Sequence, residues 1–316
     1  MKKANNWKLI ALFGVLVVIF VTTRIFLSPK LEGNLPTNLT DIDSAKVTEL
    51  IIAPGKDRNG EIRLVRTKKW KLQKGKITWR LEQGAGENAL RQVMSIGPER
   101  IVTKKKNKWK EFEVSDSTGT RVKVLVGSST VADLWIGRSG FSQTAGSRFG
   151  GNSFTYVRLN GENEVYAVEG SLDAQFNRKF DDWRDKSFMR MKRDSLSKIT
   201  FRYPADSSFQ IEKRQGKWIK GPQIADSATM SSYLMGLEYK NMSEFASALP
   251  VGDPPYMVTF ENGSKLIAKV EAWPGPVLWT LRSSHQSETY FSSTPDLIKE
   301  LLIGPMKVFP KSKTGP

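Results

Sequence analysis

The longest apolar segment of the chain is LIALFGVLVVIFVTTRIFL at residues 9–27. A membrane-spanning helix needs about 20 mainly apolar residues, and this run reaches that length if Arg24 extends its guanidinium to the interface. Lysines crowd the amino side of the run, so the positive-inside bias favours a cytoplasmic N-terminus and an exported remainder. No small-x-small cleavage pattern follows. We therefore predict an uncleaved single-pass anchor rather than a cleaved signal peptide.

Two copies of one pattern of strands and helices follow this apolar run. In the first copy the segments are 47–52, 62–65, 79–81, 88–96, 112–126, 156–159, 165–168 and 172–180. In the second copy they are 196–201, 209–212, 218–220, 226–237, 256–270, 279–282, 289–291 and 295–302. This alignment pairs Trp79 with Trp218. It also predicts a hairpin with a polar glycine turn at both 112–126 and 256–270.

Local chemistry supports the helices in each copy. Ser171 is a capping residue before an apolar stripe, and Thr294 followed by Pro295 is a typical helix start. The predicted fold class is α+β: an N-terminal single transmembrane helix is followed by two related modules, each a mostly antiparallel β-sheet with two short helices. The expected divisions are 1–28 (cytoplasmic N-terminus and anchor), 29–43 (linker), 44–181 (first module), 182–194 (charged connector), 195–306 (second module) and 307–316 (basic tail).

The formal net charge of +17 is unevenly distributed, with two basic stretches in the first copy at 56–80 and 100–110. Tryptophans interleave with these cations, a combination that nucleic-acid binding uses. The expected location outside the cytoplasm argues against nucleic acid, so the expected polyanions are anionic lipid headgroups, acidic envelope glycans or an acidic partner protein. The alternative is a solvated strand face above buried tryptophans. The candidate polyanion-binding residues are Arg66, Lys68, Lys69, Lys104, Lys105 and Lys106.

The segment DDWRDKSFMRMKRD at 181–194 joins the two copies. Its carboxylates Asp181, Asp182 and Asp185 have two interpretations. They form an acid/base or cation site, or they alternate with arginine and lysine in a salt-bridged surface connector. The alternation of charge favours the connector.

Other catalytic signals in the chain are weak. It has no cysteine, which excludes disulfides and thiolate sites, and its one histidine, His285, lies in a polar turn. Gly84 and Gly86 lack the third glycine of a dinucleotide fingerprint, and no Gly-x-Ser-x-Gly elbow occurs. We therefore predict no catalytic residue, no metal and no cofactor. A hydrolase using His285 or the Asp181 cluster is the least favoured alternative.

The most loop-like stretch is GRSGFSQTAGSRFGGNS at 137–153, a glycine-rich and serine-rich segment. Loops on a rigid scaffold often carry recognition, although a simple hairpin connection is the more common outcome for such a composition. If one segment contacts a partner, we expect it to be this loop. Its candidate partner-binding residues are Arg138, Phe141, Arg148 and Phe149.

A family resemblance is carried by several short motifs in a fixed order. These are WRL at 79–81, VLVG at 124–127, YVR at 156–158, EVYAV at 164–168 and WRDK at 183–186. Together they make most of the chain after the anchor similar to the bacterial domain-of-unknown-function 4340 family. The resemblance implies an N-terminal membrane anchor and no established enzymatic activity. It also implies an association with membrane components of ABC-type systems linked to gliding motility. The second copy departs from the pattern at its prolines.

These observations lead to one functional expectation and one alternative. The expected protein is a non-enzymatic, single-pass protein of the bacterial inner membrane, with a cytoplasmic N-terminus and an extracytoplasmic, periplasmic bulk. It is expected to serve as an accessory or scaffold subunit of an ABC-type transport or gliding-related complex. The alternative is a binder of anionic glycans or lipid headgroups through the basic face.

Overall fold

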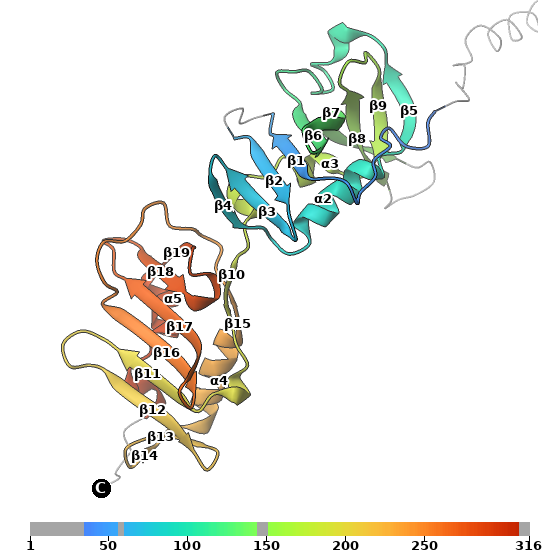
Figure 1. Ribbon diagram of the computed structural model, residues 1–316. Helices are drawn as coiled ribbons and strands as arrows, with labels where there is room; N and C mark the ends of the chain where they lie inside the picture. Colours follow the sequence, from blue (N-terminus) through green and yellow to red (C-terminus); the bar gives the residue numbers. More distant parts are fainter. Residues whose placement is uncertain (1–34, 56–59, 144–150, 310–316) are drawn as a thin grey trace, which may run out of the picture.

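The computed structural model describes residues 35–55, 60–143 and 151–309. These residues form two sheet bodies joined by one extended segment (Figure 1). The expected architecture of mostly antiparallel sheets with a few helices is confirmed, because every strand pairing within them is antiparallel. The predicted anchor at 9–27 lies outside the described residues. Among the helices that are described, none has the length and apolar character needed to cross a bilayer.

The first body is a nine-stranded sheet in the order β4-β3-β2-β1-β6-β7-β8-β9-β5. Its strands are β1 Glu49–Ala53, β2 Ile62–Arg66, β3 Trp70–Lys74, β4 Ile77–Arg80, β5 Pro98–Thr103, β6 Thr120–Val126, β7 Ser129–Gln143, β8 Gly151–Leu159 and β9 Val165–Glu169. Its helices are α2 Ala85–Met94 and α3 Leu172–Phe176, with 3-10 turns η1 Lys106–Lys108 and η2 Phe180–Trp183.

Alternation of side chains along these strands produces the first core. Leu50, Ile52 and Leu64 point to one face of the sheet, where they pack with Leu90 and Val93 of α2. Successive residues of a strand face opposite sides, so the residues between them face away from this core. A second, smaller cluster forms where the segment after β5 packs on β7 and β8, and its buried members are Trp109, Phe112, Val114, Trp135, Phe154, Tyr156, Val165 and Ala167.

The second body is an eight-stranded sheet in the order β14-β13-β12-β11-β16-β17-β18-β19. Its strands are β11 Lys198–Arg202, β12 Phe209–Arg214, β13 Lys217–Lys220, β14 Gln223–Ile224, β16 Tyr256–Asn262, β17 Lys265–Trp273, β18 Trp279–Ser283 and β19 Tyr290–Ser293. Its helices are α4 Ser227–Glu238, α5 Pro295–Leu301 and α6 Pro305–Val308, with 3-10 turns η3 Arg193–Ser195 and η4 Ser284–Gln286.

The two sheets follow the same path, but the strand order corrects the predicted alignment. Counting from each central pair, β3 occupies the place of β13 and β4 the place of β14. Trp218 in β13 therefore corresponds to Trp70 in β3, whereas the sequence comparison paired it with Trp79 in β4. The predicted order of elements was right, but the alignment left out β3 of the first body. The second body offers only the two-residue strand β14 as the counterpart of β4. In the second body, the bridge between Phe245 and Phe291 places the segment that contains Phe245 beside β19. In the first body, β5 occupies the equivalent position beside β9.

Two predicted segments of the first body differ from the structure. The hairpin expected at 112–126 is formed instead by β6 and β7, with Gly127 at positive φ in the turn. The hairpin expected at 256–270 is present as β16 and β17. Much of the loop expected at 137–153 is strand, since Ser139 pairs with Thr155 and Phe141 pairs with Ser153. Cross-strand pairing supplies hydrogen bonds that composition does not reveal.

The segment between the bodies belongs to both cores. Trp183 is fully buried in the first core, and Phe188 and Met189 are fully buried in the second. Here strand β10 Ser187–Arg190 pairs with β15 Tyr239–Asn241, which follows α4 (Figure 1). The connector is therefore fixed by burial at both ends.

Candidate functional site

The junction between the bodies is built on backbone hydrogen bonds. Glu82 N donates to Trp183 O at 2.8 Å, and Asp185 N donates to Arg80 O at 2.9 Å, so the connector extends the edge of the first sheet. From the second body, the Gln286 side-chain amide donates to Asp185 O at 3.1 Å and to Ser187 O at 2.7 Å. Buried amide groups need such partners, and these bonds hold both bodies to one short stretch of chain.

Arg184 is the central side chain of this junction. Its guanidinium lies 3.5 Å from the ring centre of Phe245 in the second body and 5.6 Å from that of Trp79 in the first. It also pairs with Asp181 at 3.1 Å, and only 12 % of its side chain is exposed. Burial lowers the pKa of Arg184, while Asp181 opposes the shift. Cations over aromatic faces are attracted to the ring quadrupole, so one side chain links both bodies.

A second ion pair and the single histidine lie beside this contact. Arg80 of β4 pairs with Glu288 of the second body at 3.0 Å, with both side chains about half exposed. His285 is in η4, where its backbone N donates to Ser283 Oγ at 3.1 Å. Burial, followed by the charge of Arg80, lowers the pKa of His285, and Asp185 opposes this shift. The histidine is therefore favoured in its neutral form near the junction.

The connector carboxylates each have a separate partner. Asp181 accepts from Arg184, and Asp182 accepts from Lys179 N at 3.2 Å and pairs with Lys186 at 3.7 Å. Asp185 accepts from Ser187 N at 2.8 Å. These contacts match the salt-bridged interpretation. Among the described residues, no group of three or more histidine, aspartate or glutamate side chains is close enough to hold a metal ion.

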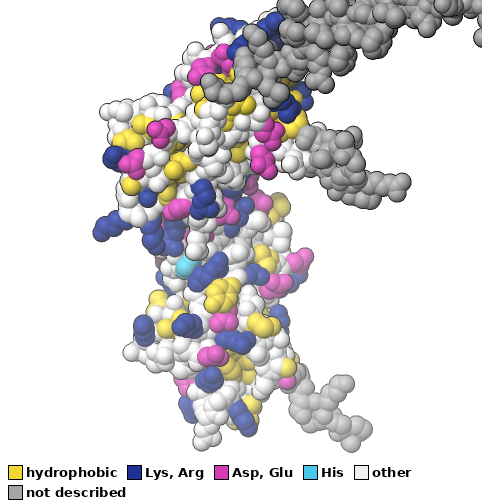
Figure 2. Space-filling view, turned by 90° about the vertical axis from the view of Figure 1, so that its right-hand side faces the viewer, with side chains coloured by type: hydrophobic (Ala, Val, Ile, Leu, Met, Phe, Trp, Pro, Cys, Tyr) yellow, Lys and Arg dark blue, Asp and Glu magenta, His cyan; other side chains and the backbone are white. Residues whose placement is uncertain are grey.

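The predicted basic residues fall into two groups. Arg66, Lys68 and Lys69 lie at the turn between β2 and β3, where Arg66 donates to Ser44 O at 2.6 Å and lies 5.6 Å from the Trp70 ring centre. Lys104, Lys105 and Lys106 follow β5, at the other edge of the sheet. The structure therefore does not bring the two groups together. On the face shown in Figure 2, Lys and Arg side chains are interspersed with Asp and Glu over both bodies.

The tryptophans among these cations are largely buried. Trp70 and Trp109 are each less than a tenth exposed, and the exposed Lys106 lies 5.2 Å from the Trp109 ring centre. Gly86 packs on the Trp70 ring and Arg158 lies 3.8 Å from the Trp109 ring centre, so these rings are covered and not available for stacking on an outside base. This arrangement matches the alternative of a solvated basic face over buried rings.

Arg158, the last residue of the YVR motif at 156–158, is a buried residue to which the sequence assigned no individual role. It lies 3.8 Å from the ring centre of Trp109, donates to Val114 O at 3.0 Å and pairs with Asp116 at 2.8 Å. Burial lowers its pKa, and the charge of Asp116 opposes the shift. Its position in an alternating strand gave no signal of this role, because the groups around it come from distant parts of the chain.

Of the four predicted partner-binding residues, two are described. Arg138 donates to Glu111 O at 3.0 Å and lies 5.2 Å from the Tyr156 ring centre, so it is held against the first body. Phe141 is 80 % exposed near the end of β7. Arg148 and Phe149 lie outside the described residues. Of the two members that the structure describes, Phe141 presents an apolar surface to solvent.

Comparison with known families gives a match. The family described as Domain of unknown function (DUF4340) matches residues 70–257. This range begins in β3 and ends in β16. It contains the whole connector, including Arg184, and also Phe245 of the second body. Comparisons with curated proteins and with solved structures found no match. Since the matched range is more than half of the chain, this protein belongs to the domain-of-unknown-function 4340 family.

Proposed function

We propose that this protein is a non-enzymatic, membrane-anchored scaffold or accessory subunit of an ABC-type transport or gliding-related complex. Residues 9–27 form the anchor in the bacterial inner membrane, and the two related modules, products of one duplication, lie on the extracytoplasmic side. The apolar run supports the membrane anchor, and the shared strand path of the two sheets supports the two related modules. The association with an ABC-type or gliding-related complex rests on what the family resemblance implies.

The observation that carries the proposal is the junction. A connector with buried residues in both cores, together with Arg184 between Trp79 and Phe245, restrains two bodies that otherwise have separate cores. Ordering a mobile pair of domains on binding costs conformational entropy. A body that is already restrained avoids part of this cost and presents two surfaces at a fixed separation, as a scaffold requires.

The test is purification of the full-length, C-terminally tagged protein from native membranes in mild detergent. Membrane components of an ABC-type transporter should copurify with it. The variant Arg184→Ala should recover less of them, because its two bodies are less restrained, while Arg91→Ala, an exposed arginine on α2, should recover as much as the unaltered protein. Recovery of no membrane protein with the unaltered chain would contradict the proposal.

A second candidate function is binding of acidic envelope glycans through Lys104, Lys105 and Lys106. The observation that favours it is their exposure in consecutive positions after β5. Attraction between exposed charges is screened by salt, with a Debye length of about 8 Å at physiological ionic strength. Retention of the solubilised full-length protein on an acidic glycan should therefore fall steeply with salt. Replacing the three lysines by alanine should reduce retention more than replacing Lys68 and Lys69, and equal retention would remove this candidate.

A further inference from the structure

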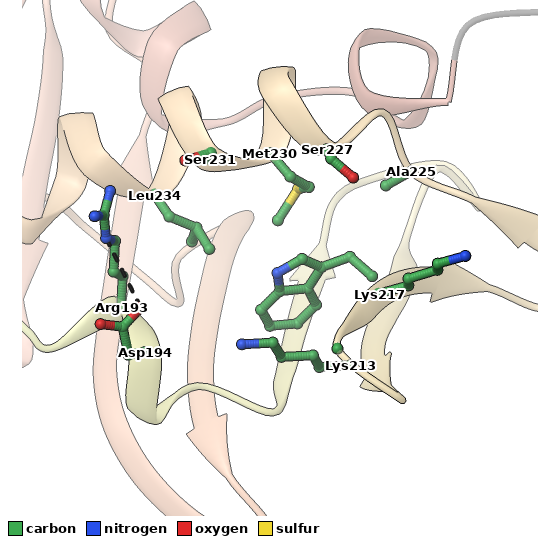
Figure 3. Close-up of a pocket in the computed structure, with 11 residues that line it drawn as sticks. Arg193, Asp194, Lys213, Lys217, Ala225, Ser227, Met230, Ser231 and Leu234 are labelled. Carbon is green, nitrogen blue, oxygen red and sulfur yellow. Dashed lines mark ion pairs between the residues drawn. The ribbon is translucent and has the colours of Figure 1, made fainter.

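A cavity of about 240 Å³ lies in the second body between α4 and the strands β12 and β13. Trp218 of β13 is one of its lining residues. In Figure 3, Lys213 lies on the strand side, Met230 and Leu234 lie on the helix side, and Arg193 and Asp194 border one end. Cavities of roughly 150 Å³ accommodate a benzene ring. This one therefore has room for a small aromatic body with an attached polar group.

The first body closes the equivalent space. There Arg66 lies over Trp70 as Lys213 lies over Trp218, with distances to the ring centres of 5.6 Å and 6.0 Å. Gly86 of α2 rests directly on Trp70, because a Cβ at this position would lie 2.4 Å from the ring. In the second body, the α4 residues that line the cavity include Met230 and Leu234, which are larger than glycine. A cavity therefore remains open between this helix and the Trp218 indole. Both bodies thus have a tryptophan ring with a cation over it, but they differ in the open space beside that ring.

The chemistry of the lining favours an anion. Three cations line the cavity, Arg193, Lys213 and Lys217, against one carboxylate, Asp194, whose side chain is 96 % exposed. Arg193 forms ion pairs with Asp194 and Glu238, each at 3.9 Å, which is longer than a hydrogen bond. In Figure 3 the ammonium of Lys213 extends along the cavity towards Arg193, while Lys217 extends the opposite way.

Two hydrogen-bond donors at the cavity are available to a ligand. In the part of the chain that the structure describes, neither the Trp218 indole N–H nor the Lys213 ammonium donates a hydrogen bond to another residue. The indole N–H is a donor only, and an ammonium has three donor hydrogens. Donors beside an apolar wall are the lining of a site that binds a molecule with one polar end and one apolar end.

We propose that this cavity binds a small amphipathic organic anion, a phosphate or carboxylate group attached to an aromatic or short apolar body. The anionic group lies between Lys213 and Arg193, and the apolar body lies against Trp218, Met230 and Leu234. This ligand site goes beyond the proposed scaffold role and does not depend on it.

The test uses the full-length protein in non-ionic detergent, labelled with 5-fluorotryptophan and observed by fluorine NMR. Of its nine tryptophans, Trp218 is assigned by the resonance that Trp218→Phe removes. Phenyl phosphate and benzoate, the two probes, distinguish a phosphate from a carboxylate site. At least one of them should shift the Trp218 resonance in a saturable way, whereas inorganic phosphate and phenol should each bind at least tenfold more weakly.

Matched variants then locate the site. Lys213→Ala should weaken probe binding roughly tenfold or more, because a charge-assisted hydrogen bond is lost. Arg66→Ala, which removes the equivalent cation over Trp70, should leave binding unchanged. Ser231→Phe fills the cavity from α4 and should abolish binding, with circular dichroism to verify its fold. The proposal is overturned by an unsaturable shift for both probes, or by equal binding of the unaltered protein and Lys213→Ala.

Discussion

Arginines over aromatic rings are the recurring contact of this protein at the scale of single residues. Arg158 lies over Trp109 in the first body, and Arg184 lies over Phe245 at the junction. Both have a lowered pKa because burial disfavours the charged form, and both keep a carboxylate partner. Guanidinium combines a flat, weakly hydrated surface with directed donors, so lysine would not replace either side chain equally.

Two glycines in helices allow a direct test of local packing. Gly86→Ala should lower the free energy of unfolding by about 1–3 kcal/mol, because the new Cβ would meet the Trp70 ring. Gly236→Ala in α4 should raise it by about 0.5–1 kcal/mol, because no atom lies within 4 Å of its Cβ and alanine favours helix. Denaturant unfolding of the two variants provides the measurement. A Gly86→Ala variant as stable as the unaltered protein would refute this packing.

At the scale of elements, capping distinguishes two helices that have similar sequence signals. Asp226 precedes α4, and its carboxylate accepts from Thr229 N at 2.8 Å and Thr229 Oγ1 at 2.7 Å. Thr294 precedes α5, but its side chain makes no capping hydrogen bond. Asp226 and Thr294 both belong to the residue types favoured at the N-cap. The rotamer that completes a cap depends on how the preceding chain enters the helix, and that is a property of the fold.

Asp226→Ala should therefore lower the melting temperature by a few degrees at neutral pH, and Thr294→Ala should change it little. The hydrogen bonds from Thr229 lower the pKa of Asp226. A carboxylate with a lowered folded-state pKa stabilises the protein above its unfolded pKa, near 3.9, and the gain is lost as the pH falls through the folded value. The difference between Asp226→Ala and the unaltered protein should shrink on acidification. Equal effects of the two variants at neutral pH would show that this cap adds nothing.

At the scale of the whole molecule, the junction sets the relation between two separate cores. Arg184→Ala removes the contact with Phe245 and Trp79, and it should lower stability by about 1–2 kcal/mol. It should also widen the distribution of distances between spin labels placed at Ser128 and Ser264. The chain has no cysteine, so two introduced cysteines label uniquely. Arg91→Ala is the control, and an unchanged distribution in Arg184→Ala would assign the restraint to the backbone bonds alone.

The sequence alone predicted the class of this fold and the existence of a repeated order of elements. Alternating apolar positions such as Leu50 and Ile52 encode strands with one buried face, since a strand repeats every second residue. The sequence also supported the salt-bridged interpretation of Asp181 and Asp182, because their partners Arg184 and Lys186 are neighbours in the chain. Signals of this kind are local, and a single sequence carries them.

The contacts that distinguish this protein depend on residues brought together from distant positions. Trp218 corresponds to Trp70 only because the sheet places β13 and β3 equivalently, and Arg184 meets Phe245 some sixty residues away only once both cores have formed. The open cavity over Trp218 likewise depends on where α4 rests, a result of packing across the sheet. Local patterns specify elements, but the spaces and contacts between elements follow from close packing of the complete chain.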